Sequence, residues 1–556
     1  METMDRRGFL QASALFGGAA ALAGLAGCAP AATKEQDLSS TGASEPESWD
    51  AEYDFVVVGG GCGVFGALLA AHSGAKVALV EKGATYGGTM ALSGNGMWVP
   101  NNKLMSSYCT GEDEFNTADT DADLPAAVDY ALSCDPFGTA DPELAKDYIY
   151  NIAPVVEHLG DTFGIEYGSI AMTDYYMLPG AKNGRAIGFA KDGTNTGIST
   201  FATIIEPLVQ QYGIEVMLNT EATQLCTDAT GAVTGVIVSG KNGAQSLKAA
   251  KGVLLNTGGF EHNEQMVADY LRGPILGCSS VQTNTGDGHR MAAAVGAAFG
   301  NMASCWGVPF YKTNDDSVTA NLCDWMTWRY GDHSIIVNSA GHRFGDESAA
   351  YAPANLDFYR YDSKTYGLPN IPGFHIGDQS FVSIYGYPGV SMGDSAATTG
   401  AQQDGLPEWV KTYDSLEELA ADNGIDAEAL VDEVNRWNAF CDAGVDEDFG
   451  RDANRWTETF FYMHDEQNPK LGKIDTPPYF CATIVPGTCG TNGGIKVNVD
   501  AQAIDLDGNV IPGLYASGNC SAAYFGSAYP GGGTTVGGGV YRACRAANHA
   551  FGLGIV

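Results

Sequence analysis

Three features of the 556-residue sequence predict an α/β fold. Residues 53–81 read as a buried strand, a glycine turn, a small-residue helix and a second buried strand that ends in an acid. Residues 214–255 contain short β runs separated by turns, which predicts an antiparallel β insertion in the sheet. Residues 311–486 are rich in Tyr, Trp and Asp and lack this rhythm, so we expect an α+β cap domain inserted into a Rossmann-like domain.

The predicted domains follow from these changes along the chain. We expect an export signal at 1–28 and a flexible linker at 29–50, which is rich in Ala, Ser, Thr, Glu and Pro. A discontinuous dinucleotide-binding domain then occupies 51–310 and 487–556, with the substrate-binding cap at 311–486 between its parts. The chain is too long for a single hydrophobic core, which agrees with this division.

The N-terminus has the pattern of a twin-arginine lipoprotein signal. Arg6-Arg7 precedes an apolar, Ala/Gly-rich run that is too short and too glycine-rich for a good membrane span. Residues 25–28 read Leu-Ala-Gly-Cys and are similar to a lipobox, so we expect cleavage before Cys28 and a lipid on its sulfur. The mature protein would then be tethered on the outer side of the cytoplasmic membrane. A chance cysteine near a plain cleavage site is the alternative.

The glycine turn predicts a ligand. Gly59, Gly61 and Gly63 let the backbone approach a pyrophosphate at the N-terminus of the following helix. Glu81, at the end of the second strand, suits both hydroxyls of a ribose. This order of elements predicts a dinucleotide site, although a glycine-rich turn in an ordinary βαβ unit has the same local pattern. Two glycine registers, one from Gly59 and one that ends at Gly66, both fit in part.

Charge and cysteine content limit the partners. The net charge is −37, from 66 acidic and 29 basic residues, so nucleic acid is not expected as a partner. The same negative field disfavours small dicarboxylate substrates. The 13 cysteines are scattered without a CxxC pair, and we expect no disulfide framework and no metal site. An iron–sulfur cluster built from distant cysteines stays open.

Further elements have recognisable limits. Residues 141–160 carry apolar side chains at helical spacing, with Asp141 as the cap and Pro154 as an expected kink. An acidic helical stretch is expected at 416–440. Near the C-terminus, a strand at 514–516 leads into a turn, and residues 529–535 open a small-residue helix.

Six blocks of sequence together point to a family. They are residues 86–102, 258–263, 284–288, 334–338, 511–519 and 529–533. The chain resembles, over residues 51–556, the 3-ketosteroid dehydrogenase branch of the FAD-dependent fumarate reductase/succinate dehydrogenase flavoprotein family. The resemblance implies a Rossmann-like FAD-binding domain with non-covalent FAD, its pyrophosphate at the glycine turn and its ring near the helix start at Gly533. The FAD-binding residues it implies are Gly59, Gly61, Gly63, Glu81, Lys82, Gly88, Thr89, Ser93, Gly94, Gly96, Asp287, Gly518, Asn519 and Thr535.

The same resemblance assigns catalytic roles to tyrosines. Tyr351 matches the residue that takes a proton from the carbon beside a ketone, and Tyr529 with the Gly533 N–H matches the pair that binds the 3-keto oxygen. Tyr175 matches the tyrosine that assists the base, with Tyr176 as a rival. Asp346 and Cys305 depart from the family pattern at positions that shape the substrate site.

These residues favour hydride transfer between a flavin and the carbon–carbon bond next to a ketone. Tyr529 stands where the dicarboxylate branch has an arginine, which favours a neutral ketone or enone, such as a steroid, over fumarate. An outer location suggests a membrane or extracytoplasmic electron carrier as partner, with reduction as one direction. The alternatives are a reductase of another conjugated alkene, such as an aromatic acrylate, and a binding lipoprotein without activity. Residues 394–399 faintly resemble a covalent flavinylation signal.

Overall fold

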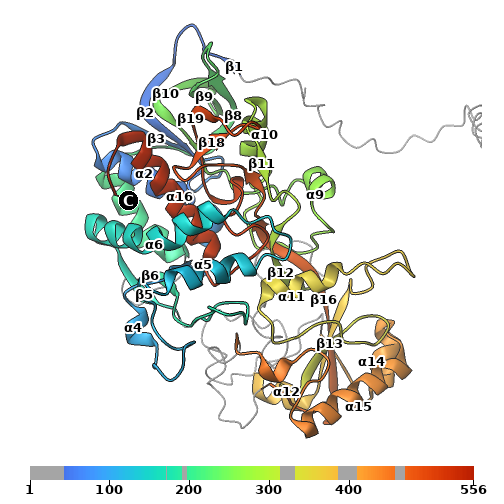
Figure 1. Ribbon diagram of the computed structural model, residues 1–556. Coiled ribbons are helices and arrows are strands. Elements are labelled where there is room, and N and C mark those ends of the chain that lie inside the picture. The colour runs from blue at the N-terminus through green and yellow to red at the C-terminus, as the bar shows by residue number, and fades with distance from the viewer. Residues whose placement is uncertain are drawn as a thin grey trace, which may run out of the picture. The chain divides into compact units, whose positions relative to one another are not determined.

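The computed structural model describes residues 43–170, 172–190, 197–312, 332–385, 410–456 and 470–555. These ranges build four β-sheets with helices packed against them (Figure 1). The export signal, Cys28 and residues 394–399 lie outside the described residues. Among the described residues, no helix has the length and apolar character that crossing a membrane requires.

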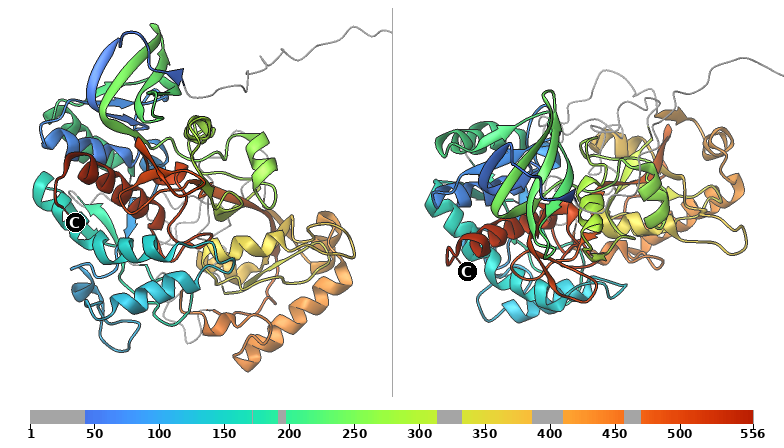
Figure 2. Two further views of the ribbon diagram at one scale, coloured as in Figure 1. Left: turned by 45° about the horizontal axis from the view of Figure 1, so that its top comes forward. Right: turned by 90° about the horizontal axis from the view of Figure 1, so that it is seen from above.

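The largest sheet has a parallel centre and an antiparallel flank. Strands β2, β3 and β7 pair in parallel, and β10 pairs in parallel with both β2 and β19. Strands β8, β9 and β10 form the antiparallel flank, and the long β9–β10 hairpin is visible in Figure 2. The strands of this sheet are β1 (Ala43–Ser44), β2 (Ala51–Val58), β3 (Val77–Val80), β7 (Glu215–Met217), β8 (Glu221–Thr227), β9 (Val233–Gly240), β10 (Gly243–Leu255), β18 (Gln502–Ile504) and β19 (Val510–Ala516).

The centre of this sheet is buried on both faces, which explains its continuous apolar runs. Residues Phe55 to Val58 of β2 and all four residues of β3 are buried. Helix α2 (Gly63–His72) packs on the sheet and against α16 (Thr534–Phe551), beside which it lies in Figure 1. The two helices approach closely, because a Cβ at Gly66 would lie 2.7 Å from the backbone oxygen of Ala543. The strand–turn–helix–strand prediction for 53–81 is confirmed.

Two smaller sheets complete the frame around the site. One has the order β12–β16–β14–β13 with β15 on β16, and the other has the order β4–β6–β5. The first of these sheets runs from Cys305 to Thr491. Its first and last strands in the sequence, β12 and β16, therefore extend past both predicted limits of the cap. The division into two domains stays a prediction. The strands are β4 (Gly96–Trp98), β5 (Glu166–Ser169), β6 (Ala186–Ala190), β12 (Cys305–Tyr311), β13 (Ser334–Val337), β14 (Gly373–Gly377), β15 (Lys411–Tyr413) and β16 (Tyr479–Thr491); β11 (Phe299–Gly300) and β17 (Gly494–Ile495) form the fourth sheet.

Helices flank these sheets on several sides. The remaining α-helices among the described residues are α3 (Gly88–Leu92), α4 (Met105–Tyr108), α5 (Leu124–Ser133), α6 (Pro142–Phe163), α7 (Gly197–Thr200), α8 (Glu206–Gln211), α9 (Glu264–Tyr270), α10 (Asp287–Ala294), α11 (Tyr351–Leu356), α12 (Gln379–Tyr385), α14 (Leu416–Asn423) and α15 (Ala427–Ala443).

The structure corrects several predicted elements. Strand β7, expected within the antiparallel insertion, is a parallel neighbour of β3. The expected helix at 416–440 is two helices, since Gly424 ends α14 with a φ of +70°. Helix α6 is capped by Asp141 as expected, but it continues through Pro154 to Phe163. The end of the predicted linker is not free: β1 pairs with β8, and the Asp50 carboxylate accepts a hydrogen bond from the Ser246 N–H at 2.8 Å.

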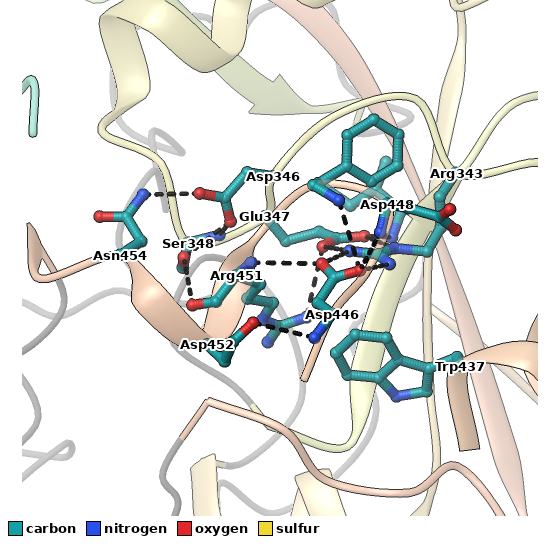
Figure 3. Close-up of polar contacts among 12 residues, drawn as sticks. Arg343, Asp346, Glu347, Ser348, Trp437, Asp446, Asp448, Arg451, Asp452 and Asn454 are labelled. Carbon is teal, nitrogen blue, oxygen red and sulfur yellow. Dashed lines mark hydrogen bonds and ion pairs between the residues drawn. The ribbon is translucent and has the colours of Figure 1, made fainter. Parts of the chain in front are cut away.

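A buried ion network joins the sheet that contains β13 to the loop that leads to α11 (Figure 3). The Arg343 guanidinium binds Glu347 at 2.7 and 2.8 Å and Asp446 at 2.9 and 3.0 Å. Arg451 adds a hydrogen bond from its Nη1 to the backbone oxygen of Ser334 at 2.7 Å. Tyr351, the first residue of α11, follows Glu347 closely in the sequence. The network therefore anchors the start of α11.

Candidate active site

The glycine turn lies at the carboxyl end of the parallel strands, where doubly wound sheets bind ligands. Strand β2 ends at Val58 and α2 begins at Gly63. Gly59 has a φ of +104°, and a Cβ there would lie 2.0 Å from the Asn256 backbone oxygen. The turn therefore requires glycine for both its conformation and its close approach to the next strand.

Two side chains hold this turn in place. The Glu81 carboxylate accepts hydrogen bonds from the N–H groups of Gly60 at 2.9 Å and Gly83 at 2.7 Å. The Asn256 Oδ1 accepts one from the Gly63 N–H at 2.9 Å, while its Nδ2 donates to the Ser517 Oγ at 2.8 Å. Asn256 thus ties α2 to both neighbouring strands.

A cavity opens beside the turn. It runs from the glycines past Glu81 to the first turn of α16, whose positive dipole end faces it through Thr535 and Val536. The predicted cofactor residues that line it are Gly59, Gly61, Glu81, Lys82, Gly88, Thr89, Ser93, Asp287, Gly518, Asn519 and Thr535.

Three predicted cofactor residues do not line the cavity. The N–H of Gly63 donates its hydrogen bond to Asn256. A Cβ built at Gly94 would have no neighbour within 4 Å, and Gly96 packs against Gly533. A Cβ at Gly533 would lie 2.3 Å from the Gly96 backbone carbon, so this glycine pair brings β4 against the start of α16. Their part in the site is to let these backbones meet.

Lys82 has an ionic role at one end of the cavity. Its Nζ lies 2.9 Å from Asp287 and 3.2 Å from Glu221, and these two carboxylates raise its pKa although burial opposes them. Asp287 begins α10 and also pairs with Arg290. The cavity thus brings together a glycine turn, the Glu81 carboxylate after the second parallel strand and a helix N-terminus. These are the groups with which dinucleotide-binding folds hold their ligand.

The predicted catalytic tyrosines come together in an aromatic cluster of Tyr175, Trp306, Tyr351, Trp456 and Tyr529. The Tyr175 hydroxyl donates a hydrogen bond to the Tyr351 hydroxyl oxygen at 2.7 Å. The Tyr529 ring lies 5.3 Å from that of Tyr175 and 5.6 Å from that of Tyr351, between centroids. Tyr529 also lines the cofactor cavity, so the cluster and the cavity share a wall.

The electrostatics of the cluster favour neutral phenols. Burial and then the neighbouring Tyr175 and Tyr529 raise the pKa of Tyr351 well above its ordinary value of 10.0. Burial also raises the pKa of Tyr529, against the lowering effect of the Tyr351 hydroxyl and the Gly533 backbone N–H. Tyr529 and Gly533 belong to the same turn, and Gly533 is the N-cap of α16.

A second buried ion network holds Tyr175. Its backbone N–H donates to the Pro530 oxygen at 2.8 Å, and Asp174 bridges to Gly531. The Asp174 carboxylate accepts hydrogen bonds from the Trp98 Nε1 and the Arg185 Nη1, each at 2.7 Å. Tyr175 is thereby fixed to the turn that carries Tyr529.

The neighbouring Tyr176 lies at the edge of both the aromatic cluster and the largest core cluster. Its backbone N–H donates a hydrogen bond to the Tyr130 hydroxyl at 3.2 Å. Of the two rivals, Tyr175 has the position next to Tyr351 that the assisting role requires.

Some site residues were not predicted. Asn256 follows β10, and its bridging role depends on segments distant in sequence. Trp456 packs 5.9 Å from the Tyr175 ring, and no local pattern marks it. Cys489, on β16, lines the cavity near the Trp306 oxygen, 3.5 Å from its Sγ. Among the described residues, no group of His, Cys, Asp and Glu is placed to hold a metal ion.

Comparison with known proteins matches this arrangement. The profile of the family described as FAD binding domain covers residues 54–536. The chain is 33% identical over 554 residues to a 3-oxosteroid 1-dehydrogenase of Mycobacterium tuberculosis, which covers 87% of this chain and 96% of the relative. It is 30% identical over 575 residues to the digoxin reductase of Eggerthella lenta, which covers 94% of this chain and 93% of the relative.

A solved structure has the same fold. The crystal structure of 3-ketosteroid Δ1-dehydrogenase from Sterolibacterium denitrificans, in complex with 1,4-androstadiene-3,17-dione, superposes with a TM-score of 0.79. The two chains are 26% identical, and the match covers 91% of this chain and 100% of that one.

Proposed function

Since the chain belongs to the FAD binding domain family, we propose that it is an exported oxidoreductase that transfers hydride between FAD and the carbon–carbon bond beside a ketone, with 3-ketosteroids as substrates. The enzyme class is that of its relatives, FAD-dependent oxidoreductases acting on CH–CH bonds. The observation that carries the proposal is the Tyr175–Tyr351 hydrogen bond beside Tyr529, at the wall of the cofactor cavity.

In this proposal the ketone oxygen binds between the Tyr529 hydroxyl and the Gly533 N–H. Two donors on one oxygen stabilise the enolate that forms when the neighbouring C–H loses its proton, by about 3 kcal/mol per donor. The ketone thus makes an otherwise inert carbon acidic.

Tyr351 takes that proton. The raised pKa of Tyr351 makes its phenolate a strong base that is scarce at neutral pH. The Tyr175 hydroxyl, which donates to the Tyr351 oxygen at 2.7 Å, holds that oxygen in place. Bound FAD supplies the hydride acceptor in dehydrogenation and the hydride donor in reduction. In the reverse direction Tyr351 returns the proton to the substrate carbon.

The aromatic cluster supports an apolar substrate. Two tryptophans and three tyrosines pack together at the proposed reaction centre and make its surroundings apolar. The 30% identity to a digoxin reductase favours the reductive direction as a second candidate, with another conjugated alkene as the oxidant.

The cellular location is part of the proposal. The twin-arginine pattern at Arg6-Arg7 and the lipobox before Cys28 support export and a lipid anchor on the outer side of the cytoplasmic membrane. A membrane or extracytoplasmic carrier would then exchange electrons with the flavin.

Fractionation of cells that express the protein tests this location. We expect the wild-type protein in the membrane fraction, the Arg6→Lys/Arg7→Lys variant in the cytoplasm and the Cys28→Ser variant released from the membrane. A wild-type protein found in the soluble fraction would refute the anchor.

An anaerobic single-turnover experiment tests the activity. The protein from residue 28 onward is purified with its flavin, reduced with dithionite and mixed with a 3-keto-4-ene or 3-keto-1,4-diene steroid. We expect rapid reoxidation of the flavin by the steroid. Reoxidation by aromatic acrylates but not by steroids would retain the enzyme class and overturn the substrate.

A further inference from the structure

Trp306 connects two residues that line the cofactor cavity, although it does not line that cavity itself. Its indole Nε1 donates a hydrogen bond to the Asn519 Oδ1 at 2.9 Å. Its ring packs on the Tyr529 ring, with 4.9 Å between the centroids. Asn519 and Tyr529 both line the cavity, whereas Trp306 is only 5% exposed. No step of the proposed reaction assigns a role to this connection.

An irregularity of the β12–β16 ladder places Trp306 there. Cys305 pairs with Thr491 and Gly307 pairs with Thr488, so two residues of β16 lie opposite the single residue Trp306. Such a bulge changes the direction of the side chains beside it. The Thr488 hydroxyl clamps the bulge, because it lies 2.9 Å from the Trp306 backbone oxygen and accepts a hydrogen bond from the Gly490 N–H at 3.0 Å.

The bulge also makes room for the Asn519 amide. Gly490, one of its two residues on β16, has a φ of +149°. A Cβ at Gly490 would lie 2.4 Å from the Asn519 Nδ2. Glycine at this position therefore lets the Asn519 side chain lie against β16 while it reaches Trp306.

The bond to Trp306 decides which end of the amide faces the cavity. An indole N–H can only donate a hydrogen bond, so the amide oxygen of Asn519 must face Trp306. Among the described residues, no group accepts a hydrogen bond from the Asn519 Nδ2. The two N–H donors of Asn519 are therefore left for a ligand in the cavity.

We infer that Trp306 is a positioning residue that holds the Asn519 amide with its N–H donors toward the flavin of bound FAD. The inference deepens the proposed function and rests on it in one respect: hydride transfer at the tyrosine cluster places the flavin ring at this end of the cavity. Without the indole N–H, the amide is free to turn its oxygen toward the cofactor, which replaces donors by an acceptor.

The midpoint potential of the bound flavin tests this role without any steroid. Hydrogen-bond donors beside a flavin favour its reduced, electron-rich state. Trp306→Phe retains an aromatic ring on Tyr529 and loses the N–H. We expect the two-electron reduction equilibrium of the FAD-loaded protein to become about tenfold less favourable, which lowers the potential by about 30 mV in a spectroelectrochemical titration.

A double-mutant cycle separates positioning from general loosening of the site. Asn519→Ala should lower the potential as well, and Trp306→Phe/Asn519→Ala should lower it no further, because the indole acts through Asn519. Trp437→Phe is the matched control: it removes another buried indole hydrogen bond, to the Gly472 oxygen at 2.9 Å, and should leave the potential unchanged. Additive shifts, no shift in Trp306→Phe, or an equal shift in Trp437→Phe would overturn the inference.

A structure of the wild-type protein keeps the inference falsifiable if Trp306→Phe does not fold. In a crystal structure with FAD, we expect a flavin oxygen or nitrogen at about 2.7–3.2 Å from the Asn519 Nδ2. A flavin without such an atom near Asn519 would overturn the inference. Because neither test uses a steroid, a protein that fails the steroid assay but shows the coupled shifts would lose only its proposed substrate.

Discussion

At the scale of single residues, the central feature is the hydrogen bond between two tyrosines. The Tyr175 and Tyr351 hydroxyls lie 2.7 Å apart in a buried site. Replacement Tyr351→Phe removes the proton acceptor and leaves the ring, so we expect a 10²- to 10⁴-fold fall in kcat. Flavin content and spectrum should stay unchanged, which an absorbance scan checks.

The adjacent tyrosine offers the control for this prediction. Tyr176 contacts the aromatic cluster from its edge, whereas the hydrogen bond to the Tyr351 hydroxyl comes from Tyr175. Tyr176→Phe should keep kcat within a few fold of wild type. Equal losses in the two variants would show that the cluster acts through packing and not through proton transfer.

The raised pKa of Tyr351 predicts a pH profile. Its pKa lies well above 10.0, so at neutral pH the deprotonated fraction is small and grows about tenfold per pH unit. Stopped-flow flavin reduction by a saturating 3-ketosteroid should accelerate with this slope from pH 6 to 9. Reduction of an enone, which uses the protonated phenol, should show no such rise; a bell-shaped curve near neutrality in dehydrogenation would contradict Tyr351 as the base.

The sequence alone predicted those site residues whose role depends on their neighbours along the chain. Gly59 and Glu81 follow strand ends, and the glycines near Gly533 precede a helix, so their places could be read in order. Asn256 and Trp456 could not be predicted, because their contacts join segments distant in sequence.

At the scale of elements, the Asp174 segment positions the active site. Asp174 binds Trp98 and Arg185 and bridges to Gly531, which fixes Tyr175 against the turn before α16. Asp174→Asn retains an acceptor for Trp98 but loses the charge that pairs with Arg185. We expect kcat to fall at least tenfold with little change in KM and no loss of FAD.

Asp123→Asn is the matched control for that element. Asp123 belongs to the same cluster through Lys182, 3.1 Å away, but its side chain is 35% exposed. Its replacement should leave kcat nearly unchanged, as for most surface ion pairs. Rescue of activity by Asp174→Glu would further separate positioning from general instability, whereas loss of FAD in Asp174→Asn would contradict the positioning role.

The elements that were predicted wrongly from the sequence depend on tertiary contacts or backbone conformation. The parallel pairing of β7 with β3 depends on a strand distant in sequence, and no local pattern specifies it. The break at Gly424 falls inside an apolar periodicity that continues from α14 into α15, and only the left-handed φ reveals it. Pro154 stays within α6 because buried side chains on both of its sides hold the helix against the core.

At the scale of the whole molecule, buried arginines stabilise buried carboxylates in the folded state. Burial alone would raise the pKa of Asp446, but the hydrogen bonds and charge of Arg343 hold it below its ordinary value of 3.8. Because the folded pKa is depressed, this stabilisation is present above pH 3.8 and is lost as the pH falls through the folded pKa.

Removal of Arg343 should therefore destabilise the fold. Arg343→Met leaves Glu347 and Asp446 buried without a cation, and we expect a loss of about 3–5 kcal/mol in the free energy of unfolding at pH 7. Urea unfolding at pH 7 measures it, and the gap to wild type should narrow below pH 4. Arg436→Met, which removes an exposed arginine paired with Asp448, should cost about 1 kcal/mol or less. Equal costs in the two variants would contradict the role of the buried network.

The most direct measurement is a crystal structure of the FAD-loaded protein with 1,4-androstadiene-3,17-dione. We expect the 3-keto oxygen at about 2.6–3.1 Å from both the Tyr529 hydroxyl and the Gly533 nitrogen, with the Tyr351 hydroxyl facing the adjacent carbon. A steroid bound with its ketone away from Tyr529 and Gly533, or no steroid in the aromatic cluster, would contradict the proposed site and chemistry.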